Sequence, residues 1–122
     1  MTLNRPEARN ALDEPSLRAL ARCFRELGAG KKCGRAAAVV LDGAGPVFCA
    51  GADIHWMRRA ACYGKAANRR DAGLLLAALR AIEASPLPVI GKIHGAAYGG
   101  ALGLVAACDI VVAEEKTRLS FS

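Results

Sequence analysis

The sequence has few aromatic residues and no long apolar run. Aromatic residues make up 5% of its 122 residues, although 53% are apolar, enough to build a core. Its most apolar stretch, residues 96–107, is shorter than the roughly 18 residues that a membrane helix needs and is interrupted by glycines. Residues 1–12 contain no apolar signal core. We therefore expect a cytoplasmic protein with no membrane partner.

CxxC cysteine pairs are also absent. The five cysteines form no CxxC pair and leave one over, which argues against a disulfide framework and against a zinc or other metal site. We expect reduced, mostly buried thiols, with Cys108 in its AACDI run as the most core-like. Neither histidine lies near a cysteine in an obvious family signature, so a catalytic thiol has no support from spacing.

Positive charge is in excess but is not concentrated in a tract. The net charge is +6, and the basic residues include the pairs Lys31–Lys32, Arg58–Arg59 and Arg69–Arg70. These pairs suit either a solvated surface or an anionic ligand such as a polyphosphate. Because no aromatic residues are interleaved with them, we do not expect a nucleic-acid partner.

The hydrophobic pattern alternates between strands and helices and predicts an α/β fold. Asp13 is a candidate N-cap, Pro15 fits the first turn, and Leu17, Leu20, Ala21, Phe24 and Leu27 have helical spacing up to Gly28. Further helices are expected over 54–62, over 65–84 and up to residue 107. Strands are expected over 36–41, 88–94, 110–113 and 118–122.

Two loops of small residues each follow a strand and precede a helix. They are Cys49–Asp53 (CAGAD) and Tyr98–Ala101 (YGGA). Free backbone N–H groups point out of a helix start, so two converging loops could hold one oxyanion between two main-chain donors. The alternative is that the glycines serve tight turns or close packing. Neither loop has the Gly-Lys-Ser/Thr of a P-loop or a proper GxGxxG.

Three longer motifs contain these loops. They are TLNRPEARNAL (2–12), VVLDGAGPVFCAGADI (39–54) and PVIGKIHGAAYGGALGLVAACDIVVAEE (88–115). In this order and spacing the chain resembles the enoyl-CoA hydratase/isomerase family, also called the crotonase family, over nearly its whole length. The resemblance implies a spiral of ββα repeats, of which residues 1–122 would be an incomplete N-terminal portion lacking the C-terminal part. It also implies assembly as a homotrimer or hexamer.

The resemblance further implies a site for an acyl-CoA thioester. The thioester carbonyl would accept hydrogen bonds from the N–H groups of Ala52 and Gly100, which can stabilise an enolate by about 3–4 kcal/mol per donor. Coenzyme A enters as part of the substrate, so no separate cofactor is expected. The other substrate-binding positions implied by the resemblance are Ala8, Arg9, Ala11, Ala50, Gly51, Asp53, Ile54, Tyr98 and Gly99.

The chain departs from the hydratase pattern at the catalytic carboxylates. Hydratases of the family commonly use two glutamates; the first position here is Gly103, and the second would lie just beyond Ser122. The glycine version resembles a branch of methylglutaconyl-CoA or carboxygeranoyl-CoA hydratases, which implies a 3-methyl-enoyl-CoA substrate. A single carboxylate would also suit an enoyl-CoA isomerase. A non-catalytic CoA-binding fragment is a further alternative, and we expect residues 1–122 alone to be inactive.

The remaining polar and aromatic candidates receive structural or binding roles. Asp53 is expected to be structural or a loop cap rather than a base, Asp109 to be structural, and Glu114 and Glu115 to be exposed. His55 could contact CoA, and His94 is expected to be a satisfied core or interface residue. Trp56 and Met57 fit either an acyl pocket or a subunit contact. A serine peptidase with a related fold is disfavoured, because Ser16, Ser85, Ser120 and Ser122 lie on no glycine elbow.

Overall fold

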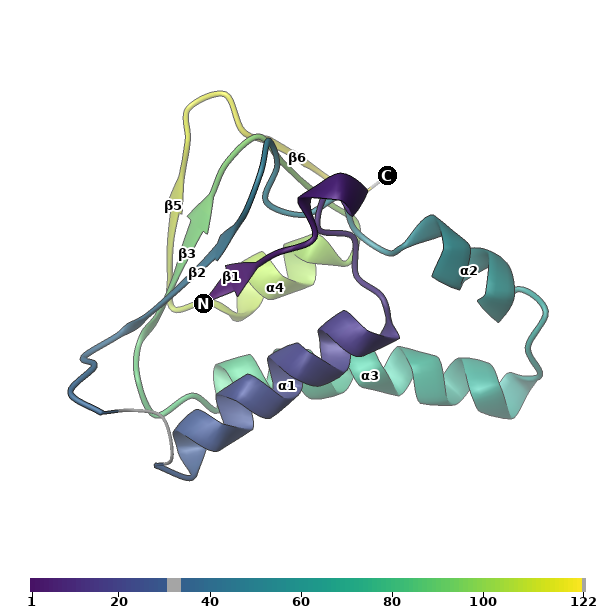
Figure 1. Cartoon of the computed structure of the whole chain (residues 1–122), viewed down its shortest axis with the longest axis horizontal. Coiled ribbons are helices and arrows are strands. Elements are labelled where there is room, and N and C mark those ends of the chain that lie inside the picture. Colours follow the sequence, from purple (N-terminus) through teal and green to yellow (C-terminus); the bar gives the residue numbers. More distant parts are fainter. Residues whose placement is uncertain (31–33, 122) are drawn as a thin grey trace.

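The computed structural model describes residues 1–30 and 34–121. The Lys31–Lys32 pair, Cys33 and Ser122 lie outside the described residues. In chain order the elements are β1 (Thr2–Leu3), η1 (Pro6–Ala8), α1 (Glu14–Gly28), β2 (Val39–Gly43), α2 (Ile54–Ala60), α3 (Lys65–Glu83), β3 (Val89–Ile93), β4 (Ala96–Tyr98), α4 (Ala101–Ala107), β5 (Ile110–Ala113) and β6 (Arg118–Ser120) (Figure 1).

The main sheet is parallel throughout. Its strand order is β1-β2-β3-β5, with Val39 opposite Val89 and Ile90 opposite Ile110. Parallel neighbours need long crossover connections, and the helices between the strands provide them. The predicted α/β alternation is therefore confirmed. The strand expected over 36–41 begins later, at Val39, because residues 36–38 are exposed and only Val39 and Leu41 point into the core.

A second, smaller layer lies at one end of the main sheet. Strands β4 and β6 pair in parallel, and two isolated parallel bridges extend this layer, one between Cys49 and Ala97 and one between Leu12 and Ala52. Four segments that are distant in sequence thus lie side by side. The sequence pattern did not predict β4 as a separate strand, although this layer positions both glycine loops.

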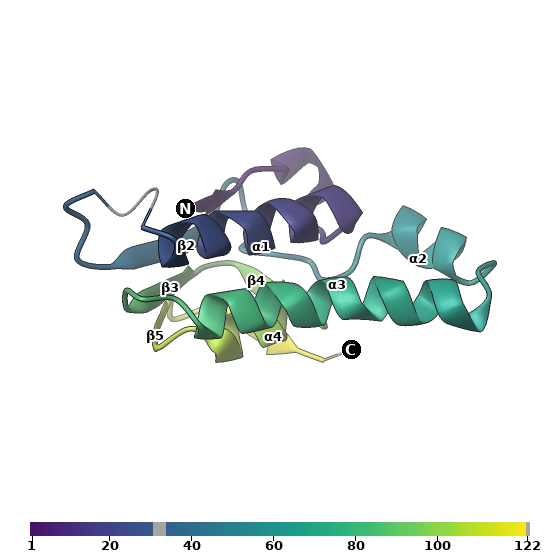
Figure 2. The ribbon, with the colours of Figure 1, turned by 90° about the horizontal axis from the view of Figure 1, so that it is seen from below.

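Helices α1 and α3 run side by side and cover one face of the structure (Figure 2). The Asp13 side chain accepts a hydrogen bond from Ser16 N at 2.9 Å, so the predicted N-cap is confirmed. The five apolar positions predicted for α1 are all buried. On α3, Ala78 and Ile82 are buried, while Leu74, Leu75 and Leu79 pack partly exposed against the same core.

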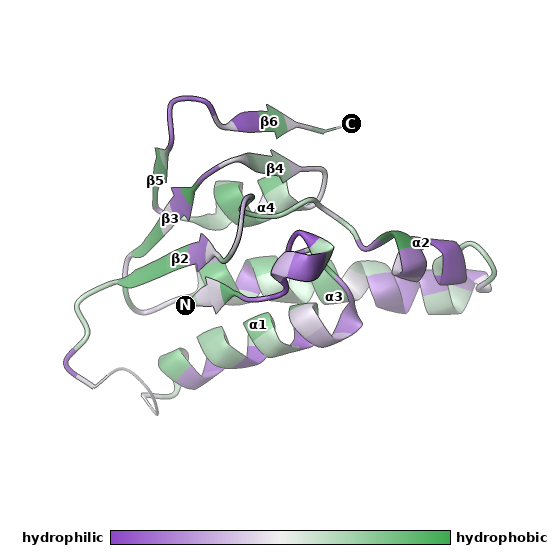
Figure 3. Ribbon diagram, turned by 45° about the horizontal axis from the view of Figure 1, so that its top comes forward, coloured by the Kyte–Doolittle hydropathy of each residue, from purple (hydrophilic) through white to green (hydrophobic). Residues whose placement is uncertain are grey.

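The edge strand β5 is apolar but uncovered by the described residues. Each of its four residues is exposed, and Figure 3 shows hydrophobic colour along it. No helix among the described residues is long and apolar enough to cross a membrane.

The cysteines differ from expectation. The prediction of mostly buried thiols is wrong for the described cysteines: Cys49 is buried, Cys23 and Cys108 are half-buried, and Cys62 is exposed. Cys108 is not the most core-like, because it follows α4 at the margin of the sheet. Cys49 is fully buried because its backbone is paired with β4 inside the second layer.

Candidate functional site

The first glycine loop is held between two neighbouring segments by backbone hydrogen bonds. On one side Cys49 N donates to Ala96 O at 3.1 Å, and Tyr98 N donates to Cys49 O at 3.1 Å. On the other side Leu12 N donates to Gly51 O at 2.7 Å, and Asp53 N donates to Leu12 O at 2.8 Å. Parallel bridging of this kind leaves the N–H of Ala52 pointing away from Leu12.

The two glycine loops touch at Gly51 and Tyr98. Gly51 has a φ of +93°, a region that residues with a side chain rarely adopt. A Cβ atom on Gly51 would also lie 2.6 Å from Tyr98 O, which leaves no space for a side chain. Gly99 has a φ of +52° and donates from its N–H to Ser120 O at 2.9 Å. The glycines are thus required by tight turns and close packing, and these turns bring the two loops together.

Ala52 and Gly100 face one cavity. The cavity has a volume of about 200 Å³, and both residues belong to its lining. No described residue accepts a hydrogen bond from the N–H of either one. The rest of the lining is mostly apolar and comes from α1, α2, α3 and the residue Leu12 before α1; it comprises Leu12, Leu17, Trp56, Met57, Ala60, Asn68, Asp71, Ala72 and Leu75. The structure thus brings together the two predicted donors, whose catalytic role stays a prediction.

Arg5 and Asn10 support this arrangement, and sequence reasoning missed both. The Asn10 side-chain amide donates to the carbonyls of Ala44, Val47 and Phe48 at 2.8–3.1 Å, and its oxygen accepts from Arg5 N at 2.8 Å. Asn10 is buried and has a positive φ of 54°, which asparagine tolerates better than most residues. In the sequence, the feature that could have pointed to Asn10 is its position shortly after a turn that contains proline.

Asp53 is the N-cap of α2, a more specific form of the structural role expected for it. Its carboxylate accepts a hydrogen bond from Trp56 N at 3.1 Å and lies 3.5 Å from the Arg5 guanidinium. The Trp56 N–H is the largest cause that lowers the pKa of Asp53 below its ordinary value; burial opposes this, and the His55 N–H and Arg5 add to it. Arg5 also donates to Ala11 O at 2.8 Å and pairs with Asp13 at 2.9 Å, so it ties α1 to the first loop.

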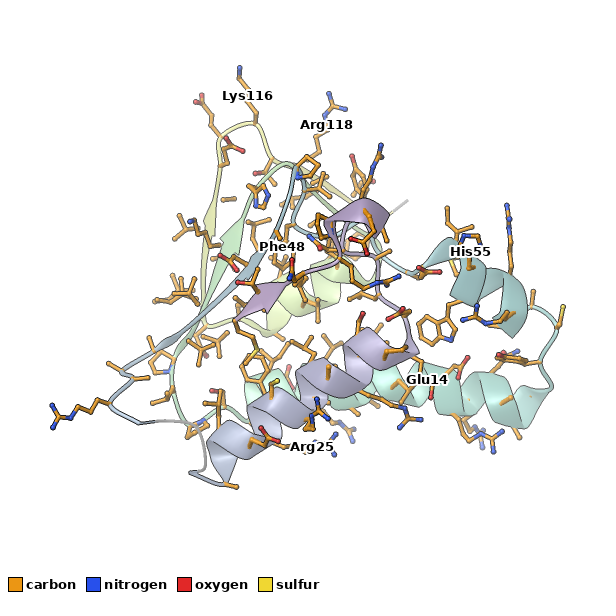
Figure 4. The ribbon with its side chains drawn as sticks, viewed as in Figure 1. Glu14, Arg25, Phe48, His55, Lys116 and Arg118 are labelled. Atoms are coloured by element: carbon orange, nitrogen blue, oxygen red, sulfur yellow. The ribbon has the colours of Figure 1, made fainter. Side chains whose placement is uncertain are left out.

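The positions implied as CoA-binding lie in and around η1, the first glycine loop and the start of α2. Ala8 ends η1, Arg9 has a φ of 51° and accepts from Ala50 N at 3.0 Å, and Ala11 is buried. Ile54 is 63% exposed at the start of α2. His55 is exposed on the outer side of α2 (Figure 4).

Two further residues of the lining carry polar side chains, and no sequence motif singled them out. Asp71, on α3, accepts a hydrogen bond from the Trp56 indole N–H at 3.1 Å. Asn68 lies one turn earlier on the same helix and also lines the cavity. Of the two locations considered for Trp56 and Met57, the structure places both side chains at the cavity.

Gly103 packs against α3. A Cβ atom built on Gly103 would lie 3.2–3.3 Å from the methyl carbons of Leu79, closer than ordinary contact. The position at which many hydratases carry a glutamate is therefore covered by a leucine side chain. Elsewhere, Asp109 accepts from Val89 N at 2.7 Å, which confirms its structural role. His94 Nε2 lies 2.7 Å from Gly45 O, so His94 has a polar partner, but it is half-buried rather than a core residue. Glu114 and Glu115 are exposed beyond β5.

Comparison with known proteins gives a consistent result. The sequence model of the family described as enoyl-CoA hydratase/isomerase matches residues 1–122. A probable enoyl-CoA hydratase of Mycobacterium bovis is 40% identical over 110 residues, covering 90% of this chain and 40% of the relative. The mitochondrial Δ(3,5)-Δ(2,4)-dienoyl-CoA isomerase of Mus musculus is 38% identical, covering 88% of this chain and 35% of the relative.

Solved structures agree with the sequence comparison. The crystal structure of an enoyl-CoA hydratase from Mycobacterium smegmatis matches with a TM-score of 0.87 and 38% identity, over 97% of this chain and 44% of that one. The fold is thus the crotonase-like α/β fold that the motifs predicted. The chain belongs to the enoyl-CoA hydratase/isomerase family. It spans about 40% of the length of the M. bovis relative.

Proposed function

We propose that the protein containing this chain binds acyl-CoA thioesters and stabilises the thioester enolate with the N–H groups of Ala52 and Gly100. One observation carries the proposal: both N–H groups lack an acceptor among the described residues and both border a single, mostly apolar cavity. Such donors act strongly in a site that excludes water, and they require no charged side chain. The apolar lining suits the hydrocarbon part of an acyl group.

The proposed reaction is the hydration of a 2-enoyl-CoA. Water adds its oxygen to C3, and the electrons of the double bond move toward the thioester oxygen, where the two N–H donors meet the developing negative charge. A proton then returns to C2, which gives the 3-hydroxyacyl-CoA. Gly103 can activate no water, so the proposal assigns this task to the carboxylate that the resemblance puts beyond Ser122. The finer proposal is a branched, 3-methyl acyl chain.

A double-bond isomerase is the second candidate. Isomerisation needs one group that removes and returns a proton, so the glycine at position 103 is compatible with it. Relatives named as dienoyl-CoA isomerases match the chain about as well as those named as hydratases. A non-catalytic CoA-binding protein is the third candidate. The proposed assembly is a homotrimer or hexamer, which light scattering of the purified protein measures.

The test uses the full-length protein. We expect it to bind crotonyl-CoA and 3-methylcrotonyl-CoA in calorimetry and to convert at least one of them with loss of the enoyl absorbance. Conversion of 3-enoyl-CoAs alone would establish the isomerase instead. Binding without conversion of either class would favour the non-catalytic protein. Absence of binding to every acyl-CoA would overturn the proposal.

A further inference from the structure

We propose that Asp71 sets the charge specificity of the acyl pocket: its carboxylate disfavours acyl groups that carry a carboxylate of their own, and it admits neutral ones. The proposal rests on the proposed function of the cavity as an acyl site. Asp71 is the one carboxylate in the lining that the described residues form, and this lining also includes Ala52 and Gly100.

The position of Asp71 along α3 brings it near the candidate oxyanion donors. Leu75 lies four residues after Asp71 on the same helix, and its Cδ2 atom is 3.6 Å from where a Cβ of Gly100 would stand. Side chains four residues apart share one helix face, about one 5.4 Å turn from each other. Asp71 therefore lies about one turn from the residue that contacts Gly100, on the lining of the same cavity.

The Asp71 side chain is held in place by α2. Trp56 donates its indole N–H to Asp71 Oδ2 at 3.1 Å, and the Trp56 ring packs against the hydrophobic core. Trp56 is itself positioned by the Asp53 cap, which accepts a hydrogen bond from its backbone N–H. A continuous set of contacts thus links the first glycine loop to Asp71, which gives the carboxylate a fixed place beside the cavity.

The negative charge of Asp71 is not neutralised by an ion pair in the described structure, although Arg18 and Arg70 border a neighbouring cavity together with it. No described Lys or Arg side chain forms an ion pair with it, and its hydrogen-bond donor, the indole of Trp56, is neutral. The other lining residues carry no charge. Two like charges several ångströms apart in a partly buried site repel each other enough to change binding by roughly 10- to 100-fold. A neutral acyl group meets no such penalty.

The charge of Asp71 distinguishes between two substrates of the kind that the sequence resemblance implies. A 3-methylglutaconyl group and a 3-methylcrotonyl group share the same branched 2-enoyl core, and they differ by a carboxylate on one methyl carbon. Asp71 disfavours the first and not the second. The proposed 3-methyl preference is thus retained, while the acidic acyl group implied by the methylglutaconyl-CoA branch is disfavoured.

The experiment measures dissociation constants of these two CoA thioesters for the full-length protein by calorimetry. We expect the wild type to bind 3-methylcrotonyl-CoA 10- to 100-fold more tightly than 3-methylglutaconyl-CoA. Asp71→Asn keeps the shape and an acceptor for the indole, and it should reduce this ratio at least tenfold. Glu83→Gln is the matched control, because Glu83 is an exposed carboxylate on the same helix outside the cavity lining. It should leave the ratio unchanged.

A second variant covers the possibility that Asp71→Asn folds poorly. Trp56→Phe keeps an aromatic ring but removes the N–H donor that fixes Asp71, so the ratio should fall partway toward one. An unchanged ratio in both variants would overturn the role of Asp71, even with tight binding of the neutral thioester. A wild type that binds the acidic thioester as well as the neutral one would overturn it too. Failure to bind either thioester would instead overturn the proposed function, and the inference with it.

Discussion

Gly51 and Tyr98 lie in direct backbone contact, and this contact sets the distance between the two glycine loops. A Cβ atom on Gly51 would stand 2.6 Å from Tyr98 O, and Gly51 has a φ of +93°. One residue after Gly51 comes Ala52, and two residues after Tyr98 comes Gly100. The two candidate donors therefore reach the same cavity because the first loop has a residue without a side chain where it meets the second loop.

Replacement of Gly51 by alanine should destabilise the protein by about 2–4 kcal/mol. The cost combines backbone strain of about 1–3 kcal/mol with the displacement of the Tyr98 carbonyl. Gly73→Ala is the control, since Gly73 is exposed within α3 and a Cβ there meets nothing within 4 Å. That substitution should stabilise the protein by up to about 1 kcal/mol. Urea unfolding of the wild type, Gly51→Ala and Gly73→Ala measures the two changes in stability. Equal stability of Gly51→Ala and the wild type would contradict the close contact between Gly51 and Tyr98.

Gly103 and Leu79 should show strong coupling in a double-mutant cycle. A glutamate at position 103 must displace the Leu79 methyl groups, which lie 3.2–3.3 Å from the Cβ position. Gly103→Glu alone should therefore be more destabilising than Gly103→Glu in a Leu79→Ala background. The coupling energy should fall between about 0.5 and 3 kcal/mol. If the changes in free energy of unfolding of Gly103→Glu and Leu79→Ala simply add, the glutamate side chain does not point toward Leu79, and the expectation is contradicted.

The Asp53 carboxylate should contribute stability that depends on pH. Its pKa is lowered in the folded protein, chiefly by the Trp56 N–H. The charged form is therefore favoured by folding, so its contribution is present above the ordinary aspartate pKa of about 3.9 and is lost as pH falls through the folded value. Asparagine is also a good N-cap, so Asp53→Asn isolates the charge.

Urea unfolding at pH 6 and pH 3 checks this expectation. The wild type should exceed Asp53→Asn in free energy of unfolding by about 1–2 kcal/mol at pH 6, and the difference should be smaller at pH 3. A difference that stayed constant between the two pH values would show that the charge of Asp53 contributes nothing.

Cys49 and Cys62 should differ sharply in reactivity. Burial raises the pKa of the Cys49 thiol to about 11, so only about 0.1% is thiolate at pH 8, and its S–H donates to Asn10 O at 3.1 Å. Cys62 is exposed. Alkylation at pH 8 followed by peptide mass mapping should modify Cys62 within minutes and leave Cys49 unmodified until the protein is unfolded. Equal labelling of both would contradict the buried position of Cys49.

Local sequence chemistry predicted the elements whose boundaries are set locally. Helix α1 was predicted because Asp13 caps it and its apolar residues repeat at helical spacing, and both features act without distant partners. Strand β4 was missed for the opposite reason. Its three small or aromatic residues carry no period of their own, and they form a strand only because Cys49 and β6, far away in the sequence, pair with them.

The candidate site likewise contains residues that local motifs predict and residues whose partners are distant in the sequence. Ala52 and Gly100 were found through motifs, and the structure places both at one cavity. Asp71 was not found, because on the sequence it is one charged residue among several on a long helix. Its contact with Trp56 exists only once α2 has folded back toward α3. Asn10 was missed similarly, since its three carbonyl partners belong to residues 44–48.

The central claim is that the N–H groups of Ala52 and Gly100 stabilise the substrate's developing oxyanion. Replacing the backbone amide N–H by an ester oxygen at either position removes the donor and keeps the side chain. In the full-length protein, the replacement at Ala52 or at Gly100 should lower kcat for the enoyl-CoA substrate by roughly 10²- to 10³-fold. The same replacement at Ala66, in the first turn of α3 where the N–H has no intrahelical partner, should leave kcat unchanged. A kcat within a factor of about two of the unmodified protein for the ester at Ala52 and at Gly100 would contradict the claim.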